Sequence, residues 1–456
     1  MTSNGTPCDA VPLRIDSIEV RNYRRFAHLA VDFHPELTVV VAKNGCGKTA
    51  VLDAIAVALG PFIGAFDNAT GVHFRASDVR RVRNPKAVPV EMEQQYPLTM
   101  TAEGVINGTP DTWRRELVGA KSRTTYGESR ALIDFGKSLQ GMVRDTAAGE
   151  GSGPPILPLV SYYGTGRLWG DRRLTTGKTT ENATSRMAGY LDCLDSASHY
   201  KVFADWFERL SRMEYEERNV PERLTEVLGL LSAIRTAVDA ALSISGWHGI
   251  TFKSSQLGIV AEHDTDGQLP VEWLSDGIRN MIALVADIAH RAVRLNAHLG
   301  SEAARLTPGI VMIDEVDMHL HPEWQQTVIQ SLRLAFPRVQ LIVTTHSPQV
   351  LTTVRKEHVR LLTEDGVVQT LSDDVGTFGS ESSRLLQEVF GVHSRPPGVE
   401  AVAKLREYMQ LIESNEHETT RAKHLRRDLE DAMGSGDPDL LLADIRISQL
   451  KVLRRT

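Results

Sequence analysis

The sequence predicts an α/β fold in which helices cover a mostly parallel sheet. A β-branched run, Leu37–Val41, precedes a glycine-containing loop and the apolar helical pattern of Ala50–Leu59. Two more apolar runs, Ile310–Ile313 and Leu341–Thr344, are separated by the helix-like stretch Glu323–Leu334. Because strands and helices alternate along the chain, we expect the strands to be parallel and joined by crossover helices.

Two further regions complete the predicted architecture. Leu13–Phe33 alternates apolar and polar side chains, which predicts an antiparallel β element before the main sheet. Met187–Ser245 has helical periodicity and predicts a helical insertion. We therefore expect an N-terminal lobe, a helical insertion, a C-terminal lobe and a C-terminal helical region, over residues 1–186, 187–256, 257–395 and 396–456 respectively.

Composition limits the classes of protein that fit. The 456 residues are 41% hydrophobic and 24% charged, as in ordinary globular proteins, and the net charge of -7 argues against a body that coats nucleic acid. Cys8, Cys46 and Cys193 are too few and too scattered for a disulfide framework. No apolar run reaches the roughly 18 residues of a membrane-spanning helix, and the N-terminus lacks a secretory pattern. We expect a cytoplasmic protein.

The loop after the first predicted parallel strand has the strongest motif of the chain. It reads Ala42-Lys43-Asn44-Gly45-Cys46-Gly47-Lys48-Thr49, which matches a phosphate-binding loop except that Ala42 replaces the first glycine. Backbone N–H groups would surround the phosphates, Lys48 would reach the β and γ oxygens, and Thr49 would ligate Mg²⁺. The alternative is a glycine-rich turn without a ligand. The expected nucleotide-binding residues are Asn44, Gly45, Cys46, Gly47, Lys48, Thr49 and Ala50.

A second motif ends a predicted strand in two carboxylates. Gly309–Ile313 is apolar and is followed by Asp314 and Glu315, which places both at the carboxyl edge of the sheet, where α/β proteins bind ligands. Asp314 would hold Mg²⁺ through its hydration shell, and Glu315 would orient and polarise the attacking water. On its own such a strand end is usually structural. Together with the upstream loop it predicts a site for ATP and Mg²⁺.

A third motif, Leu274-Ser275-Asp276-Gly277-Ile278-Arg279, opens another predicted helix. It resembles the signature of ABC-type ATPases. Asp276 and Arg279 depart from the transporter form of that signature and look more like the variant of SMC-like, RecF-like and OLD-like members. The resemblance implies an ABC-type P-loop NTPase in which Ser275 and the N–H of Gly277 contact the γ-phosphate held by the opposite subunit. The alternative is an ordinary serine-capped helix. Arg279 would either neutralise charge across that interface or form a structural salt bridge.

Two more segments match the same family. Val316–Pro322 resembles the D-loop at the subunit interface, which implies a nucleotide-site role for Asp317. His319 and His321 could form a metal pair, although packing or interface roles fit their spacing better. Leu341–Pro348 resembles the switch strand, which implies that His346 senses the γ-phosphate. The catalytic residues implied by the resemblance are Lys48, Ser275, Glu315 and His346.

Looser sequence features narrow the resemblance to the PtuA ATPases of Septu and retron-associated anti-phage systems. They are Tyr162–Trp169, Asp317–Trp324, Phe378-Gly379 and Arg395-Pro396. This likeness implies a homo-oligomeric ATPase that controls a separately encoded nuclease, of HNH type. The aromatic side chains of Tyr162–Trp169 could stack on adenine or a partner, or could simply belong to the core.

Three alternatives stay open from the sequence. A DNA-repair or recombination ATPase could bind DNA through the basic stretch Arg75–Lys86, which could equally be a solvated face. The ATPase of a transporter fits less well, because of Asp276 and the insertion. Asp437 and Asp439 have the spacing of a Toprim nuclease centre but stand in a Gly/Pro turn.

Overall fold

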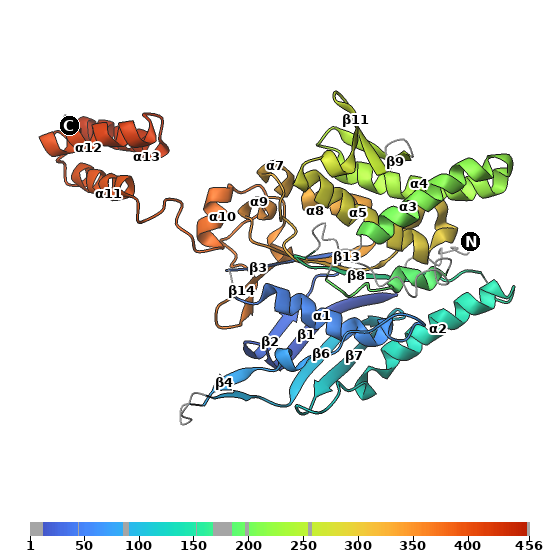
Figure 1. The fold of residues 1–456 in the computed structure, drawn as a ribbon. Helices are drawn as coiled ribbons and strands as arrows, with labels where there is room; N and C mark the ends of the chain where they lie inside the picture. The colour runs from blue at the N-terminus through green and yellow to red at the C-terminus, as the bar shows by residue number, and fades with distance from the viewer. Residues whose placement is uncertain are drawn as a thin grey trace, which may run out of the picture. The chain divides into compact units, whose positions relative to one another are not determined.

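The computed structural model describes residues 12–43, 45–84, 91–151, 153–166, 185–196, 200–253 and 258–453. The chain divides into two compact units, Met1–Ser382 and Ser383–Thr456. The first unit has the expected α/β fold, with two large sheets, two small ones and a layer of helices (Figure 1).

A six-stranded sheet forms the centre of the first unit. Its strand order is β15-β14-β3-β13-β12-β8, and every pair is parallel except β14–β15. All residues of β3, β8, β12 and β13 are buried, which explains why these strands read as continuous apolar runs. The strands are β3 (Leu37–Ala42), β8 (Leu159–Tyr163), β12 (Gly309–Ile313), β13 (Val339–Thr345), β14 (Val359–Leu362) and β15 (Val368–Gln369).

The expected N-terminal antiparallel element is one half of a second sheet. This sheet has the order β2-β1-β6-β7, with β1 (Leu13–Tyr23), β2 (Phe26–Asp32), β6 (Leu98–Ile106) and β7 (Thr109–Leu117). Asn107 and Gly108, both with positive φ, form the tight turn between β6 and β7. We did not predict β7, because its polar residues mask the alternation.

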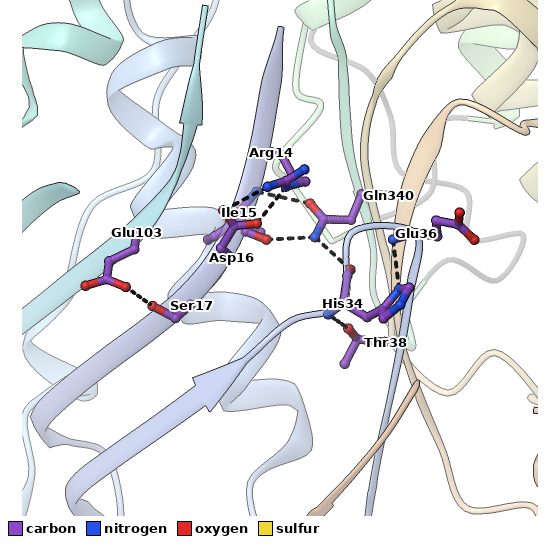
Figure 2. Close-up of polar contacts among 9 residues, drawn as sticks. All are labelled: Arg14, Ile15, Asp16, Ser17, His34, Glu36, Thr38, Glu103 and Gln340. Carbon is purple, nitrogen blue, oxygen red and sulfur yellow. Dashed lines mark hydrogen bonds and ion pairs between the residues drawn. The ribbon is translucent and has the colours of Figure 1, made fainter. Parts of the chain in front are cut away.

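Helix α1 (Lys48–Ile63) lies between the two sheets (Figure 1). Every residue of α1 is buried except Thr49 and Asp53, so the helix is apolar on all sides. A buried side chain of β13, Gln340, also joins the sheets (Figure 2). Its Nε2 donates to the Ile15 carbonyl at 2.7 Å and its Oε1 accepts from the Ile15 N–H at 3.1 Å. The two sheets are thereby fixed in one register beside α1.

Helices cover the other face of the central sheet (Figure 1). They are α3 (Tyr200–Glu216), α4 (Pro221–Leu242), α5 (Asp276–Leu295) and α8 (Val328–Ala335). The segment expected to be a helical insertion, 187–256, contains α3 and α4 but also strand β9 of a small three-stranded sheet. We did not predict this sheet, which consists of β9 (Trp247–Lys253), β10 (Gly258–His263) and β11 (Gly267–Pro270). The four expected segment boundaries stay a prediction.

Shorter elements and one amphipathic helix complete the first unit. The amphipathic helix α2 turns Leu132, Phe135 and Leu139 towards the core. The remaining helices and strands are β4 (Arg81–Arg83), β5 (Met92–Gln94), α2 (Arg130–Ala147), α6 (Ala303–Leu306), α7 (Pro322–Gln325) and α9 (Pro348–Leu351). No helix in the described part of the chain is long and apolar enough to cross a membrane.

The second unit has its own small core. Helix α10 (Ser382–Glu388) starts at the division, and α11 (Glu400–Glu413), α12 (Thr420–Met433) and α13 (Pro438–Leu453) follow. The apolar side chains of the last three helices pack together, with Leu405, Tyr408, Leu425 and Leu429 among them.

The pair Asp437 and Asp439 lies at the start of α13. Both carboxylates pair with the guanidinium of Arg395, at 2.7 and 2.8 Å. Arg395 lowers the pKa of Asp437 despite the opposing effect of burial. These contacts give the two aspartates a structural role, and the Toprim alternative finds no support.

Candidate nucleotide-binding site

The loop between β3 and α1 has the backbone of a phosphate cradle. Gly45 and Gly47 have φ of 76° and 101°, in the region that favours glycine, and a Cβ on Gly47 would come within 2.6 Å of the Phe26 ring. Ala42 ends β3 and is not among the described residues with positive φ, so alanine fits there. Asn44 lies outside the described residues.

The turn between β1 and β2 supports this loop. The sequence did not indicate this contact. Arg25 donates one hydrogen bond to the Gly45 carbonyl at 2.6 Å and another to the Glu364 carbonyl at 2.5 Å. Lys43 pairs with the Glu364 carboxylate at 3.0 Å. The loop is therefore held between the antiparallel sheet and the β14–β15 connection.

Thr49 and Asp314 meet where Mg²⁺ is expected. The Thr49 hydroxyl donates to Asp314 Oδ2 at 2.6 Å, and the Thr344 hydroxyl donates to Asp314 Oδ1 at 2.5 Å. Asp314 is buried and directly follows β12, at the carboxyl edge of the sheet. A hydroxyl and a carboxylate oxygen this close suit Mg²⁺, which takes oxygen ligands and completes its shell with phosphate and water. The residues present therefore fit the ion.

Lys48 extends from the first turn of α1 to the end of the switch strand. Its Nζ donates to the Ala42 carbonyl at 3.3 Å and contacts the His346 ring, 3.2 Å from Nδ1 and closest to Nε2. Burial lowers the pKa of Lys48, and the Glu315 and Asp314 carboxylates oppose this effect. Burial and the Lys48 charge together lower the pKa of His346. His346 is therefore a neutral ring whose unprotonated nitrogen accepts from the Lys48 ammonium.

Glu315 has a strained backbone and a half-exposed carboxylate. Its φ of 46° is uncommon for a residue other than glycine and costs on the order of 1–3 kcal/mol. The Glu315 N–H donates to the Thr344 hydroxyl at 2.8 Å, which holds this conformation. Its Oε1 lies 3.9 Å from His346 Nε2. The strained turn thus places a carboxylate beside the two residues that surround the expected γ-phosphate.

Asp317 is bound to the switch strand of its own chain. Its Oδ1 accepts a hydrogen bond from the Thr345 hydroxyl at 2.5 Å. His319, two residues on, has a φ of 63°. Among the residues that the structure describes, His319 and His321 belong to no group of three or more potential metal ligands.

The signature residues lie beside the segment that follows Asp317. A Cβ on Gly277 would come within 2.8 Å of the His319 carbonyl oxygen, so glycine is required for this close approach. Ser275 is exposed and occupies the N-cap position of α5, but its hydroxyl makes no capping hydrogen bond. Arg279 pairs with Asp276 and donates to the Glu272 carbonyl at 3.2 Å. Ser275 therefore stands at the N-cap without the hydrogen bond that an ordinary serine cap makes. Of the two roles expected for Arg279, the structure shows the salt bridge within the chain.

Tyr162 and Tyr163 are buried and form hydrogen bonds inside the protein. The Tyr162 hydroxyl donates to Asp53 Oδ1 at 2.9 Å, and Asp53 pairs with Arg24 at 2.7 Å. Stacking on adenine or a partner is thus wrong for these two rings. Arg167, Leu168 and Trp169, the end of the same motif, lie outside the described residues.

Tyr163 connects the end of β8 to the signature helix. Its hydroxyl donates to Asp287 Oδ2 at 2.7 Å, and the Arg291 Nε donates to the same oxygen at 2.8 Å. Burial alone would raise the pKa of Asp287, but Arg291 and His290 together outweigh it and hold the pKa well below its usual range. The buried pair Asp287–Arg291 therefore keeps both charges and fixes α5 against β8.

The structure thus brings Lys48, Thr49, Asp314, Glu315 and His346 together. The loop that leads into these residues contains Gly45, Cys46 and Gly47, and Ala50 follows in the first turn of α1. The neighbouring signature and D-loop segments contain Ser275, Gly277 and Asp317. Sequence reasoning missed Arg25, Asp53, Asp287 and Thr344. Only Thr344 had a signal, because a hydroxyl at the end of an apolar strand is a polar group that needs a partner.

Comparisons with known proteins match the chain to AAA domains and to probable ATPases. Residues 17–232 match the family model of an AAA domain, and residues 180–352 match an AAA domain model described with an AbiEii toxin of a type IV TA system. The chain is 26% identical to the Retron Ec83 probable ATPase of Escherichia coli, over 96% of this chain and 87% of that one. It is 25% identical to the Retron Vc95 probable ATPase of Vibrio cholerae, over 91% and 86%.

Two shorter or weaker likenesses accompany these. The Septu protein PtuA of Bacillus mycoides is 33% identical over 36% of this chain and 22% of that protein. Among solved structures, the SMC head bound to the C-winged helix domain of ScpA is 17% identical, with a TM-score of 0.45, over 79% of this chain and 98% of that one.

Proposed function

We propose that the chain is an ATPase of the SMC- and RecF-like P-loop class, related to those of retron and Septu defence systems, and that two copies enclose ATP between them. Each site would combine Lys48, Thr49, Asp314, Glu315 and His346 of one copy with Ser275 and Gly277 of the other. The observation that carries the ATP site within each copy is the hydrogen bond between Thr49 and Asp314, which joins the start of α1 to the end of β12.

The residues of one copy have distinct roles in this proposal. Lys48, whose ammonium is only partly solvated, would exchange the His346 ring for the β and γ oxygens of ATP. Glu315 would accept a hydrogen bond from the attacking water and align it with the γ-phosphorus. Thr49 and Asp314 would hold Mg²⁺, which would supply positive charge to the phosphates. His346, neutral and next to both Lys48 and Glu315, would contact the γ-phosphate.

A second copy is needed to complete the site. Ser275 is exposed and its hydroxyl does not cap α5, so it is available to a ligand outside its own helix. The α5 N-terminus adds N–H groups that favour an anion. In the symmetric arrangement each copy gives its signature to the other, so bound ATP stabilises the dimer.

A trapping experiment tests this arrangement. Glu315→Gln keeps the size of the side chain but removes the carboxylate, so the variant with MgATP should accumulate as dimers, measured by light scattering after size exclusion. Adding Ser275→Arg to Glu315→Gln should leave ATP binding intact and abolish the dimer. A monomeric Glu315→Gln protein at saturating ATP would contradict the shared site.

We extend the proposal to a regulatory role in defence. In this role the chain would hold a separately encoded nuclease, of HNH type, in the cytoplasm and release it according to nucleotide state. The relatives named as retron ATPases and as a Septu protein support a place in a defence system. The test is to purify the protein with the products of its neighbouring genes, with and without ATP. Recovery of a nuclease in one nucleotide state only is the expected result, and recovery of no other protein in either state would contradict it.

Direct DNA binding is the second candidate function. Exposed Arg81 and Arg83 on β4 favour it. The opposing strand β5 carries Glu93, which accepts a hydrogen bond from Asn84 at 2.6 Å, so the hairpin has mixed charge. Binding of duplex DNA that weakens steeply with salt, and that Arg81→Glu with Arg83→Glu abolishes, would support this function.

A further inference from the structure

The residue two positions before Ser275 is an unusually exposed tryptophan. Trp273 has a relative exposure of 76%, the highest among the exposed large apolar side chains of the described residues. Single exposed apolar residues are ordinary. An exposed tryptophan, however, leaves a larger apolar area in contact with water than other side chains do, so covering it is more favourable. Its place directly before the signature suggests a surface that is covered when the site closes.

The segment that carries Trp273 is held firmly. Val271 and Leu274 on either side are buried, and the Leu274 N–H donates to the Val271 carbonyl at 3.2 Å. The Arg279 guanidinium also donates to the carbonyl of Glu272 at 3.2 Å. The indole is therefore presented by a fixed turn, and ordering it on a partner would cost little conformational entropy.

We propose that Glu272 and Trp273 dock onto the phosphate-loop rim of a second copy of this chain, where they contact the partner's Arg25 and the partner's Lys43. This inference rests on the proposed shared site. Two residues span at most about 7 Å, so Trp273 must lie close to the partner's phosphate loop whenever Ser275 reaches the nucleotide held there.

The rim of the phosphate loop fits such a contact. Arg25 is exposed beside Phe26, with its guanidinium 5.9 Å from the ring centre, and it donates to the Gly45 carbonyl. Lys43 is 58% exposed and also pairs with the Glu364 carboxylate of its own copy at 3.0 Å. Two cations on one copy face an indole and the exposed Glu272 carboxylate on the other, and cations are attracted to an indole face and to a carboxylate. The surface that covers the exposed Trp273 is thus the phosphate-loop rim of the second copy.

Association of the Glu315→Gln protein with MgATP measures this contact. Sedimentation equilibrium at several protein concentrations gives the dimer dissociation constant, and a fluorescent ATP analogue gives nucleotide affinity at concentrations where the protein is monomeric. Trp273→Ala should weaken dimerisation by on the order of 10- to 100-fold, since tryptophans are frequent hot spots. Trp273→Phe should recover part of the loss, and nucleotide affinity of the monomer should not change.

A matched control and a double-mutant cycle complete the test. Phe378 is 65% exposed elsewhere on the first unit, so Phe378→Ala should leave the dimer constant unchanged. Trp273→Ala and Lys43→Ala should be less than additive if the two side chains meet across the dimer. Wild-type association of Trp273→Ala, while Ser275→Arg abolishes the dimer, would overturn this inference and leave the shared site standing. If Ser275→Arg also dimerises normally, the proposed function itself fails.

Discussion

Thr49 donates a hydrogen bond to Asp314 across 2.6 Å, although the two residues are 265 positions apart in the sequence. Thr344 donates to the other oxygen of the same carboxylate at 2.5 Å. Asp314 is therefore oriented by two threonines, one from the phosphate loop and one from the switch strand. A carboxylate held in this way needs little rearrangement when the metal ion and the nucleotide bind.

Removal of the Thr49 hydroxyl should uncouple nucleotide binding from Mg²⁺. Thr49→Val keeps the shape of the side chain but removes the ligand oxygen, so the increase in ATP affinity caused by Mg²⁺ should fall by roughly 10- to 100-fold. Titration with ATP in Mg²⁺ and in EDTA measures this difference. Thr49→Ser restores the hydroxyl and is the control. An undiminished effect of Mg²⁺ in Thr49→Val would show that the ion lies elsewhere.

Loss of the Glu315 carboxylate should stop hydrolysis without loss of binding. Glu315→Gln cannot polarise water, so kcat should fall roughly 10²- to 10⁴-fold while ATP affinity stays within a few-fold of wild type. Lys48→Ala should instead abolish binding, because its ammonium would neutralise the phosphates. Phosphate release and equilibrium binding separate the two effects. Wild-type turnover by Glu315→Gln would contradict the role given to this carboxylate.

His346 should set an acidic limit to activity. Burial and the Lys48 charge lower its pKa below the ordinary 6.5, so the ring is neutral at pH 7 and becomes protonated only at lower pH. A protonated ring would repel the Lys48 ammonium and could no longer accept from it. We expect kcat/KM, which reports the nucleotide-free enzyme, to fall with a midpoint below pH 6.5, and His346→Gln to remove this limb from the pH profile. A limb of the same midpoint in the variant would assign it to another group.

The buried pair Asp287–Arg291 should dominate the stability of the signature helix. Asp287→Asn leaves the Arg291 guanidinium buried without its counter-ion and should lower the free energy of unfolding by about 3–5 kcal/mol. Tyr163→Phe removes one donor and should cost about 1–2 kcal/mol. Urea unfolding measures both. Arg305→Ala, which breaks an exposed pair with Glu302, is the control and should change stability by less than about 1 kcal/mol. Equal losses in all three variants would contradict this ranking.

The parts of the fold that the sequence predicts are those with strong local patterns. The runs Leu37–Val41, Ile310–Ile313 and Leu341–Thr344 belong to three neighbouring parallel strands, because complete burial makes them apolar throughout. The order of strand, glycine loop and helix likewise predicted a helix directly after the loop, and α1 starts at Lys48, two residues before the expected Ala50. In contrast, β7 and the small sheet β9–β11 have mixed polar sequences, and their pairing depends on neighbours elsewhere in the chain.

The same division applies to the site. Lys48, Thr49, Asp314 and Glu315 stand at fixed spacings from strand ends, so their meeting follows from the sheet order. Arg25 could not be found in this way, since its partner is a backbone carbonyl of a distant loop. The Asp287–Arg291 pair looks like any charged pair on a helix until α5 is seen to be buried. The strain at Glu315 is also a tertiary property, because Thr344 holds it.

Turnover by a mixture of two inactive variants tests the shared site most directly. Lys48→Ala has no working phosphate loop and Ser275→Arg has no working signature, so neither should hydrolyse ATP alone. A mixed dimer has one complete site, which combines the phosphate loop of the Ser275→Arg copy with the signature of the Lys48→Ala copy, so an equimolar mixture should regain turnover that neither variant has alone. A mixture as inactive as its components, or a Ser275→Arg protein that hydrolyses ATP at the wild-type rate, would contradict the account.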